Sequence, residues 1–150
     1  MGFMNGMNIS ASGMTAQSVR MDTISQNIAN ASTTRDADGN VYRRQTVLFA
    51  ERDGSAFQNM LSYRSKNGTK GYTATGVKVT GIVEDHVTPL SKVYDPSHPD
   101  ADEDGYVTYP NVNTVTEMTN LIDASRSYEA NVTAFNATKN MLLKGIEVGK

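Results

Sequence analysis

Apolar residues recur at heptad spacing near both ends of this 150-residue chain, and this repeat constrains the fold more than any other feature. Such spacing places apolar side chains along one narrow stripe of an α-helix. We therefore predict one long helix within residues 5–34 and another within residues 111–148. The candidate contact residues on these stripes are Met14, Met21, Ile24 and Ile28 near the N-terminus, and Met118, Leu121, Tyr128, Val132, Phe135, Leu142 and Ile146 near the C-terminus.

Both stripes are thin, so each helix needs a partner surface. The two helices could pair with each other as an antiparallel hairpin, or pack against helices of neighbouring molecules. Only 38% of the residues are apolar and tryptophan is absent, so the isolated chain can bury little surface to offset the entropy lost on ordering. We expect the terminal segments to be disordered in the free monomer and to order on assembly.

The second helix carries a start signal. Asn113 or Thr114 can cap its first turn, and Glu117 follows Thr114 at the spacing of a capping box. The sequence therefore predicts that this helix begins just after Pro110.

Residues 35–110 have the character of β-structure. The pair Asp38-Gly39 is a turn signal before the β-prone run 41–51, the run 77–82 alternates, and 106–109 is a further short strand. Four prolines between residues 88 and 110 exclude a long helix there. We predict an α+β fold in which the terminal helices flank a small β-rich middle domain with a glycine-rich loop at about residues 55–76.

Several function classes are disfavoured by composition and by missing motifs. Fourteen basic residues against sixteen acidic ones argue against nucleic-acid binding. The absence of cysteine excludes a disulfide framework and a thiolate metal site. No apolar run is long enough for membrane insertion, the start of the chain does not resemble a cleavable signal peptide, and no catalytic motif is recognisable. We predict a protein that is not an enzyme and needs no cofactor.

One acidic run offers a competing interpretation. Asp100, Asp102 and Asp104 precede Gly105 with the spacing of the first half of an EF-hand loop. Position twelve of such a loop, which needs a glutamate, is Asn111. We interpret the run as a solvated turn and keep a secreted calcium-dependent binding module as the alternative. His86 and His98 lack paired-ligand spacing and are interpreted as surface residues.

Motifs at both ends carry a family resemblance. Residues 25–31 read Ser-Gln-Asn-Ile-Ala-Asn-Ala, and residues 93–101 read Val-Tyr-Asp-Pro-Ser-His-Pro-Asp-Ala; Gly-Tyr-Val and Pro-Asn-Val-Asn follow at 105–107 and 110–113. The match continues to residue 131, and Tyr42-Arg43-Arg44 also fits. The chain resembles the flagellar rod and hook family of axial proteins, and within it the proximal rod proteins. The resemblance covers nearly the whole chain and is poorest at about 55–76.

The resemblance implies a structural subunit of the bacterial flagellar basal-body rod, located beyond the cytoplasmic membrane in the periplasm or cell-wall zone. The implied partners are copies of the same chain, other rod proteins and the flagellar type III export apparatus, and the implied assembly is a hollow tube that transmits torque. Another axial protein remains an alternative, although distal rod and hook proteins are generally longer in the middle. The polar motif positions, which we expect to fix helix register, are Asn27, Asn30, Asn111, Asn113, Glu117, Arg126 and Glu129.

Overall fold

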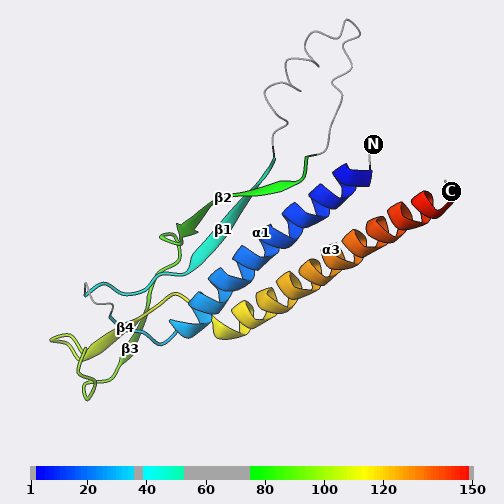
Figure 1. The fold of residues 1–150 in the computed structure, drawn as a ribbon. Helices are drawn as coiled ribbons and strands as arrows, with labels where there is room; N and C mark the ends of the chain where they lie inside the picture. The colour runs from blue at the N-terminus through cyan, green and yellow to red at the C-terminus, as the bar shows by residue number, and fades with distance from the viewer. Residues whose placement is uncertain (1–2, 36–38, 53–74, 149–150) are drawn as a thin grey trace, which may run out of the picture.

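Two long helices dominate the computed structural model, which describes residues 3–35, 39–52 and 75–148. Helix α1 spans Phe3–Ala29 and helix α3 spans Thr114–Val148. They lie side by side and antiparallel, so that both termini are at the same end of the molecule (Figure 1). The helices pair with each other as a helical hairpin within one chain. The terminal segments are thus ordered against each other here, which differs from the expectation that they order only on assembly. Neither of these described helices is long and apolar enough to cross a membrane.

Helix α3 begins with a side-chain cap. Oδ1 of Asn113 accepts hydrogen bonds from the backbone N–H groups of Val115 and Thr116, at 3.0 and 3.2 Å. These bonds satisfy two of the N–H groups that a helix start leaves without a partner. The predicted capping box does not form, because the carboxylate of Glu117 is bonded to side chains of other segments and to Asn120. Asn113, rather than Thr114, is the cap.

The middle of the chain forms two small antiparallel sheets. Strand β1 (Gln45–Glu51) pairs with β2 (Val77–Glu84), with an irregularity between Leu48 and Phe49, and β3 (Ser91–Tyr94) pairs with β4 (Tyr106–Tyr109). The β-prone run starts its pairing at Gln45 rather than at residue 41. Of the predicted turn Asp38-Gly39 only Gly39 is among the described residues, with a φ of 80°, and most of the predicted glycine-rich loop, residues 55–74, lies outside them. The predicted α+β class, with terminal helices around a β-rich middle, is confirmed.

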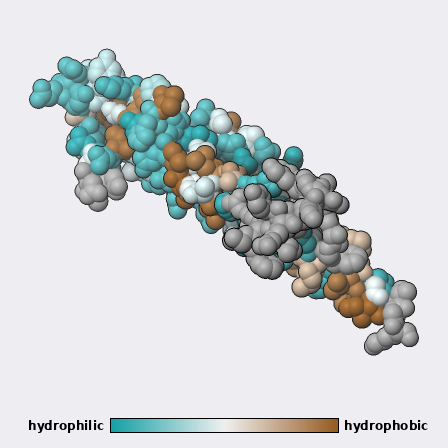
Figure 2. All heavy atoms as spheres, turned by 90° about the horizontal axis from the view of Figure 1, so that it is seen from above, coloured by the Kyte–Doolittle hydropathy of each residue, from teal (hydrophilic) through white to brown (hydrophobic). Residues whose placement is uncertain are grey.

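Helix α1 lies between two layers, with α3 on one side and the β1–β2 sheet on the other (Figure 1). The β3–β4 hairpin lies at the end far from the termini. The molecule is elongated, and seen from above its hydrophobic surface gathers over part of the sheet and at the end that carries the termini (Figure 2). Few apolar residues are fully buried, and those described are Ala16, Ile24, Val47, Val107 and Ala124.

The two helices approach closely because small residues lie between them. A Cβ atom on Gly13 would lie 2.7 Å from Oδ1 of Asn131, and one on Gly6 would lie 3.7 Å from a methyl group of Thr138. A side chain at position 13 would therefore force Asn131 to move. These two contacts, with Asn27 opposite Glu117, fix which turn of α1 faces which turn of α3.

Candidate assembly site

A buried polar cluster joins the end of α1, the start of α3 and the segment that enters β1. We call it the latch; its members are Asn27, Tyr42, Arg44, Asn111 and Glu117. Asn27 is fully buried, with 0% of its surface exposed. Its Nδ2 donates to the carbonyl oxygen of Gln45 at 2.8 Å and to Oε2 of Glu117 at 3.0 Å. Its Oδ1 accepts from the Gln45 N–H and from the Tyr42 hydroxyl, both at 2.9 Å. The amide thus uses its two donors and two acceptor positions.

The carboxylate of Glu117 is the second centre of the latch and is only 1% exposed. Its Oε1 accepts from Nε of Arg44 at 2.9 Å, lies 2.9 Å from Nη2 of Arg44, and accepts from Nδ2 of Asn120 at 3.2 Å. A buried carboxylate is costly unless it is paired and hydrogen-bonded, and here it is both. Its position in the first turn of α3 adds the favourable field of the helix N-terminus.

Asn111 extends the latch toward the second sheet. Its Oδ1 accepts from the backbone N–H of Arg44 at 2.8 Å, and its Nδ2 donates to the carbonyl oxygens of Asp85 and Thr88 at 3.0 and 3.1 Å. The backbone N–H of Asp85 in turn donates to the carbonyl of Arg44 at 2.8 Å. The Asn111 amide therefore joins the segment before α3 to the residue just before β1 and to the segment just after β2.

Burial raises the pKa of the Tyr42 phenol above its ordinary value of 10.0, and the negative charges of Glu84 and Glu117 raise the pKa further. Because Tyr42 stays protonated, it keeps donating to Asn27. The latch contains no nucleophile beside a free base, and its central acceptors already have donors. Such an arrangement can hold segments together, and it offers no position for a reacting substrate.

Comparison with known proteins identifies both ends of the chain. A model described as "Flagella basal body rod protein" matches residues 7–35, and one described as "Flagellar basal body rod FlgEFG protein C-terminal" matches residues 103–148. The flagellar basal-body rod protein FlgC of Bacillus subtilis (strain 168) is 47% identical over 150 residues, covering 97% of each chain. Those of Borreliella burgdorferi and Escherichia coli O157:H7 are 42% and 38% identical, over 99% and 100% of this chain and 98% and 100% of theirs.

The chain belongs to the FlgC family. The predicted resemblance to the proximal rod proteins is confirmed, and so is the predicted function: the chain is a structural, non-enzymatic subunit of the flagellar basal-body rod. Membership of a rod-protein family implies assembly with other rod subunits. The two matched regions, 7–35 and 103–148, contain all the latch residues except Tyr42 and Arg44.

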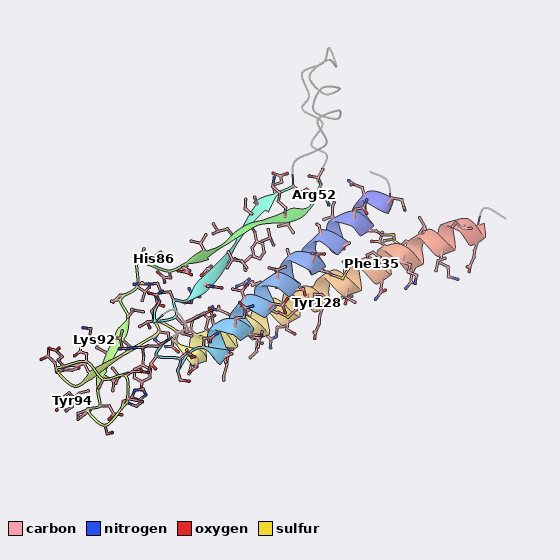
Figure 3. All side chains as sticks on the ribbon, turned by 60° about the vertical axis from the view of Figure 1, so that its left-hand side comes forward. Arg52, His86, Lys92, Tyr94, Tyr128 and Phe135 are labelled. Carbon is pink, nitrogen blue, oxygen red and sulfur yellow. The ribbon has the colours of Figure 1, made fainter. Side chains whose placement is uncertain are left out.

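The predicted stripe residues of this FlgC-family chain fall into three groups by exposure. Ile24 is buried, and Met118 and Ile146 are 53% and 59% exposed. The others are half-buried: Met14, Met21, Ile28, Leu121, Tyr128, Val132, Phe135 and Leu142. Tyr128 and Phe135 lie along the line where α3 meets α1 (Figure 3). The positions of closest approach are instead small or polar, as Gly13 and Asn131 illustrate.

The polar motif residues are also divided. Asn27, Asn111 and Glu117 are in the latch, and Asn113 caps α3. Asn30 makes a local bond, from its Nδ2 to the carbonyl of Gln26 at 2.9 Å. Arg126 and Glu129 lie exposed on α3.

Sequence reasoning missed Tyr42 and Arg44 as latch members. Their only signal was the family match of the run 42–44, because nothing in local spacing links Arg44 to Glu117, 73 positions along the chain.

The acidic run does not converge on a cation position. The carboxylate of Asp100 accepts from the Thr34 hydroxyl at 2.6 Å and lies 3.7 Å from Nε of Arg35. Oδ1 of Asp102 accepts from the backbone N–H of Asp104 at 2.9 Å, which is a local turn. Among the described residues, no three histidine, aspartate or glutamate side chains are grouped to hold a metal ion. Asp100 therefore anchors the loop after α1 to the β3–β4 hairpin.

Proposed function

We propose that this chain builds the rod through its two terminal segments, 5–34 and 111–148, with residues 35–110 as a middle domain between them. Copies of the chain and other rod proteins then form a hollow tube that transmits torque. The observation that carries this proposal is an exposed apolar stripe on α3 that is turned away from α1. Its members are Val115, Met118 and Ile122, which are 72%, 53% and 54% exposed.

These three residues follow one another at spacings of three and four, so they lie on one face of α3. Burying one large apolar side chain contributes about 1.5 to 3 kcal/mol. A stripe of three, with the predicted contact residues on both helices, could therefore supply part of the free energy that assembly needs. Arg126 and Glu129 lie further along α3, where they can pair with charges of a neighbour and fix its register.

We also propose that the chain leaves the cytoplasm through the flagellar type III export apparatus, as expected of a member of a flagellar rod-protein family. The thin core supports this, because a chain with few fully buried apolar residues loses little when it unfolds for passage. Its helices would then gain stability from neighbours once the chain reaches the rod.

The proposal is tested by deleting the gene and restoring it with variants, scored by swimming and by electron microscopy of basal bodies. The intact gene restores rods. Phe135→Asp abolishes incorporation and His98→Ala leaves it intact, because Phe135 lies against α1 and His98 is on a loop. Phe135→Asp can also unfold the hairpin, so Met118→Asp is the sharper variant: its side chain is already exposed, and folding should survive.

The matched control is Thr119→Asp, an exposed position next in sequence. Rods that contain Met118→Asp as efficiently as Thr119→Asp would contradict the assembly role of the exposed stripe. Normal rods in the deleted strain would contradict the proposed function itself.

A further inference from the structure

The end of α3 projects beyond its partner helix. Gly6 of α1 lies opposite Thr138 of α3, and α1 begins at Phe3 whereas α3 continues to Val148. The last two turns of α3 therefore pass the start of α1, as Figure 1 shows at the C-terminus. We call Leu142, Leu143, Ile146 and Glu147 the C-terminal tip. Leu143 and Ile146 are about half exposed, at 48% and 59%.

The tip continues the surface that α3 uses against α1. Ile146 follows Leu142 at a spacing of four, and Leu142 follows Phe135 at a spacing of seven, so all three lie on the same face of α3. Along most of the hairpin this face is covered by α1, and at the tip the cover ends. The apolar face of α3 therefore continues past α1, and its uncovered part is available for contact with a second apolar surface.

A concave site that fits the tip lies at the other end of the hairpin. The α1–β1 pocket has a volume of about 300 Å³. Its apolar lining residues, which we call the floor, are Ile24, Val47 and Phe49, and its polar lining residues are Arg20, Thr23, Gln45, Thr46 and Asn120, with Arg44 and Glu117 of the latch. Ile24 and Val47 are buried, and Phe49 remains 38% exposed. Three apolar side chains beside polar and charged groups suit an aliphatic side chain that carries a charged neighbour.

The charges at the two places are complementary. In the part of the chain that the structure describes, no carboxylate lies within ion-pair distance of the Arg20 guanidinium. Glu147 follows Ile146 directly, and its present partner is Lys144 at 2.8 Å, with both side chains mostly exposed. Exposed pairs of this kind contribute little to stability, so Glu147 is free to exchange partners.

The occupant of the pocket cannot be the tip of the same molecule. Asn120 and Ile146 are separated by roughly 40 Å along a continuous helix, at about 1.5 Å per residue. We propose that the C-terminal tip of one copy inserts into the α1–β1 pocket of the next copy, with Ile146 on the apolar floor and Glu147 paired with Arg20. The proposal rests on the proposed function and specifies one contact within it.

The contact joins unlike surfaces at opposite ends of an elongated molecule. Such a contact does not close on itself as a two-fold dimer does, and it repeats from copy to copy to give a ring or a helical array. A tip–tip contact would instead stop at two molecules. Head-to-tail insertion is thus the arrangement that suits a subunit of a rod.

Disulfide cross-linking in isolated basal bodies tests the contact, because the chain has no cysteine of its own. Thr46 is exposed and lines the pocket. In the double variant Thr46→Cys/Ile146→Cys, mild oxidation yields chains linked between residues 46 and 146 of different copies, identified by mass spectrometry. The control Lys92→Cys/Ile146→Cys gives none, because Lys92 lies on the β3–β4 hairpin. Links from residue 146 to residue 146, or to another rod protein, would overturn the proposal.

A charge exchange provides the second test. Arg20→Glu and Glu147→Arg each lower incorporation into basal bodies at least tenfold, and the double variant restores it to within about threefold of the original chain. The control Glu103→Arg, at an exposed loop position, leaves incorporation unchanged. A double variant that is no better than the single variants would overturn the pairing while leaving the proposed function intact. Absence of the original chain from basal bodies would overturn both.

Discussion

The two ends of the helical hairpin are built from opposite kinds of chemistry. At one end, α1 finishes and α3 starts around the buried latch, where Asn27 and Glu117 are almost completely enclosed and their polar groups have partners. At the other end, α3 passes the start of α1 with Leu143 and Ile146 exposed. The first end is complete within one chain, and the second is not.

The polar end fixes how the two helices align, and the apolar end is available for association with another molecule. Directional hydrogen bonds around a buried amide and carboxylate permit one alignment of the helices, because any shift leaves buried polar groups without partners. Apolar contact is not directional and tolerates a partner from another molecule. A subunit whose register is fixed at one end can therefore offer the other end to its neighbours without losing its own fold.

Removing the centre of the latch should have the largest effect on stability. Asn27→Ala removes the partner of the Gln45 backbone groups, of the Tyr42 hydroxyl and of Oε2 of Glu117, so we expect the free energy of unfolding to fall by about 3 kcal/mol. The measurement is urea unfolding of the purified chain. The control Asn30→Ala removes only local bonds, to the Gln26 carbonyl and from the Thr33 hydroxyl, and should change stability by less than about 1 kcal/mol. Equal effects of the two substitutions would show that the latch does not anchor the hairpin.

A substitution halfway along the hairpin should have an intermediate effect. In Gly13→Val the new side chain meets the Asn131 amide, since even a Cβ atom would lie 2.7 Å from Oδ1. We expect a loss of about 1 to 3 kcal/mol, as for other overpacked contacts. Thermal unfolding of Gly13→Val and of the double variant Gly13→Val/Asn131→Ala measures it. The second substitution should recover at least half of the loss, and no recovery would mean that the close approach is not the cause.

The latch should also give the isolated chain a pH-dependent stability. The pKa of Tyr42 is raised in the folded state, so between pH 10 and its folded-state pKa the unfolded chain releases a proton that the folded chain keeps. The stabilisation from Tyr42 is therefore fully present below about pH 10 and is lost as the pH rises through the folded-state pKa. Urea midpoints of the original chain and Tyr42→Phe should converge from about pH 10 upward. Parallel curves would contradict this role of burial.

The smallest effect on the isolated chain is expected at the tip. Ile146→Asp changes a side chain that is already 59% exposed, so unfolding should shift by less than about 0.5 kcal/mol. The same variant should fail to enter basal bodies, because the new carboxylate would be desolvated against Ile24 and Val47 and would lie near the buried carboxylate of Glu117, which also lines the pocket. Circular dichroism measures the stability of the isolated variant, and the protein composition of purified basal bodies measures its incorporation. A large loss of stability would mean that the tip is part of the fold of the single chain.

Most elements of the fold were predictable from local patterns, and β3 (Ser91–Tyr94) is the described strand that no pattern had marked. Heptad spacing marked α1 and α3, and alternation with turn signals marked β2 and β4. The latch was only partly predictable: Asn27, Asn111 and Glu117 stood out as motif positions, but the bond between Asn27 and Glu117 joins residues 90 positions apart. No periodicity carries that information, because it depends on how the helices are turned. The importance of Gly13 was hidden for the same reason, since a glycine in a helix shows a close approach only when the neighbouring helix is known.

Hydrogen exchange followed by mass spectrometry, on the free chain and on isolated basal bodies, tests the central claim most directly. Amides of α1 and α3 near Asn27 and Glu117 should exchange slowly in both samples, because the latch is complete in one molecule. Amides of residues 141–148 should exchange fast in the free chain and at least tenfold more slowly in the basal body. Equal exchange of the tip in the two samples, or protection near the latch only in the basal body, would contradict the account.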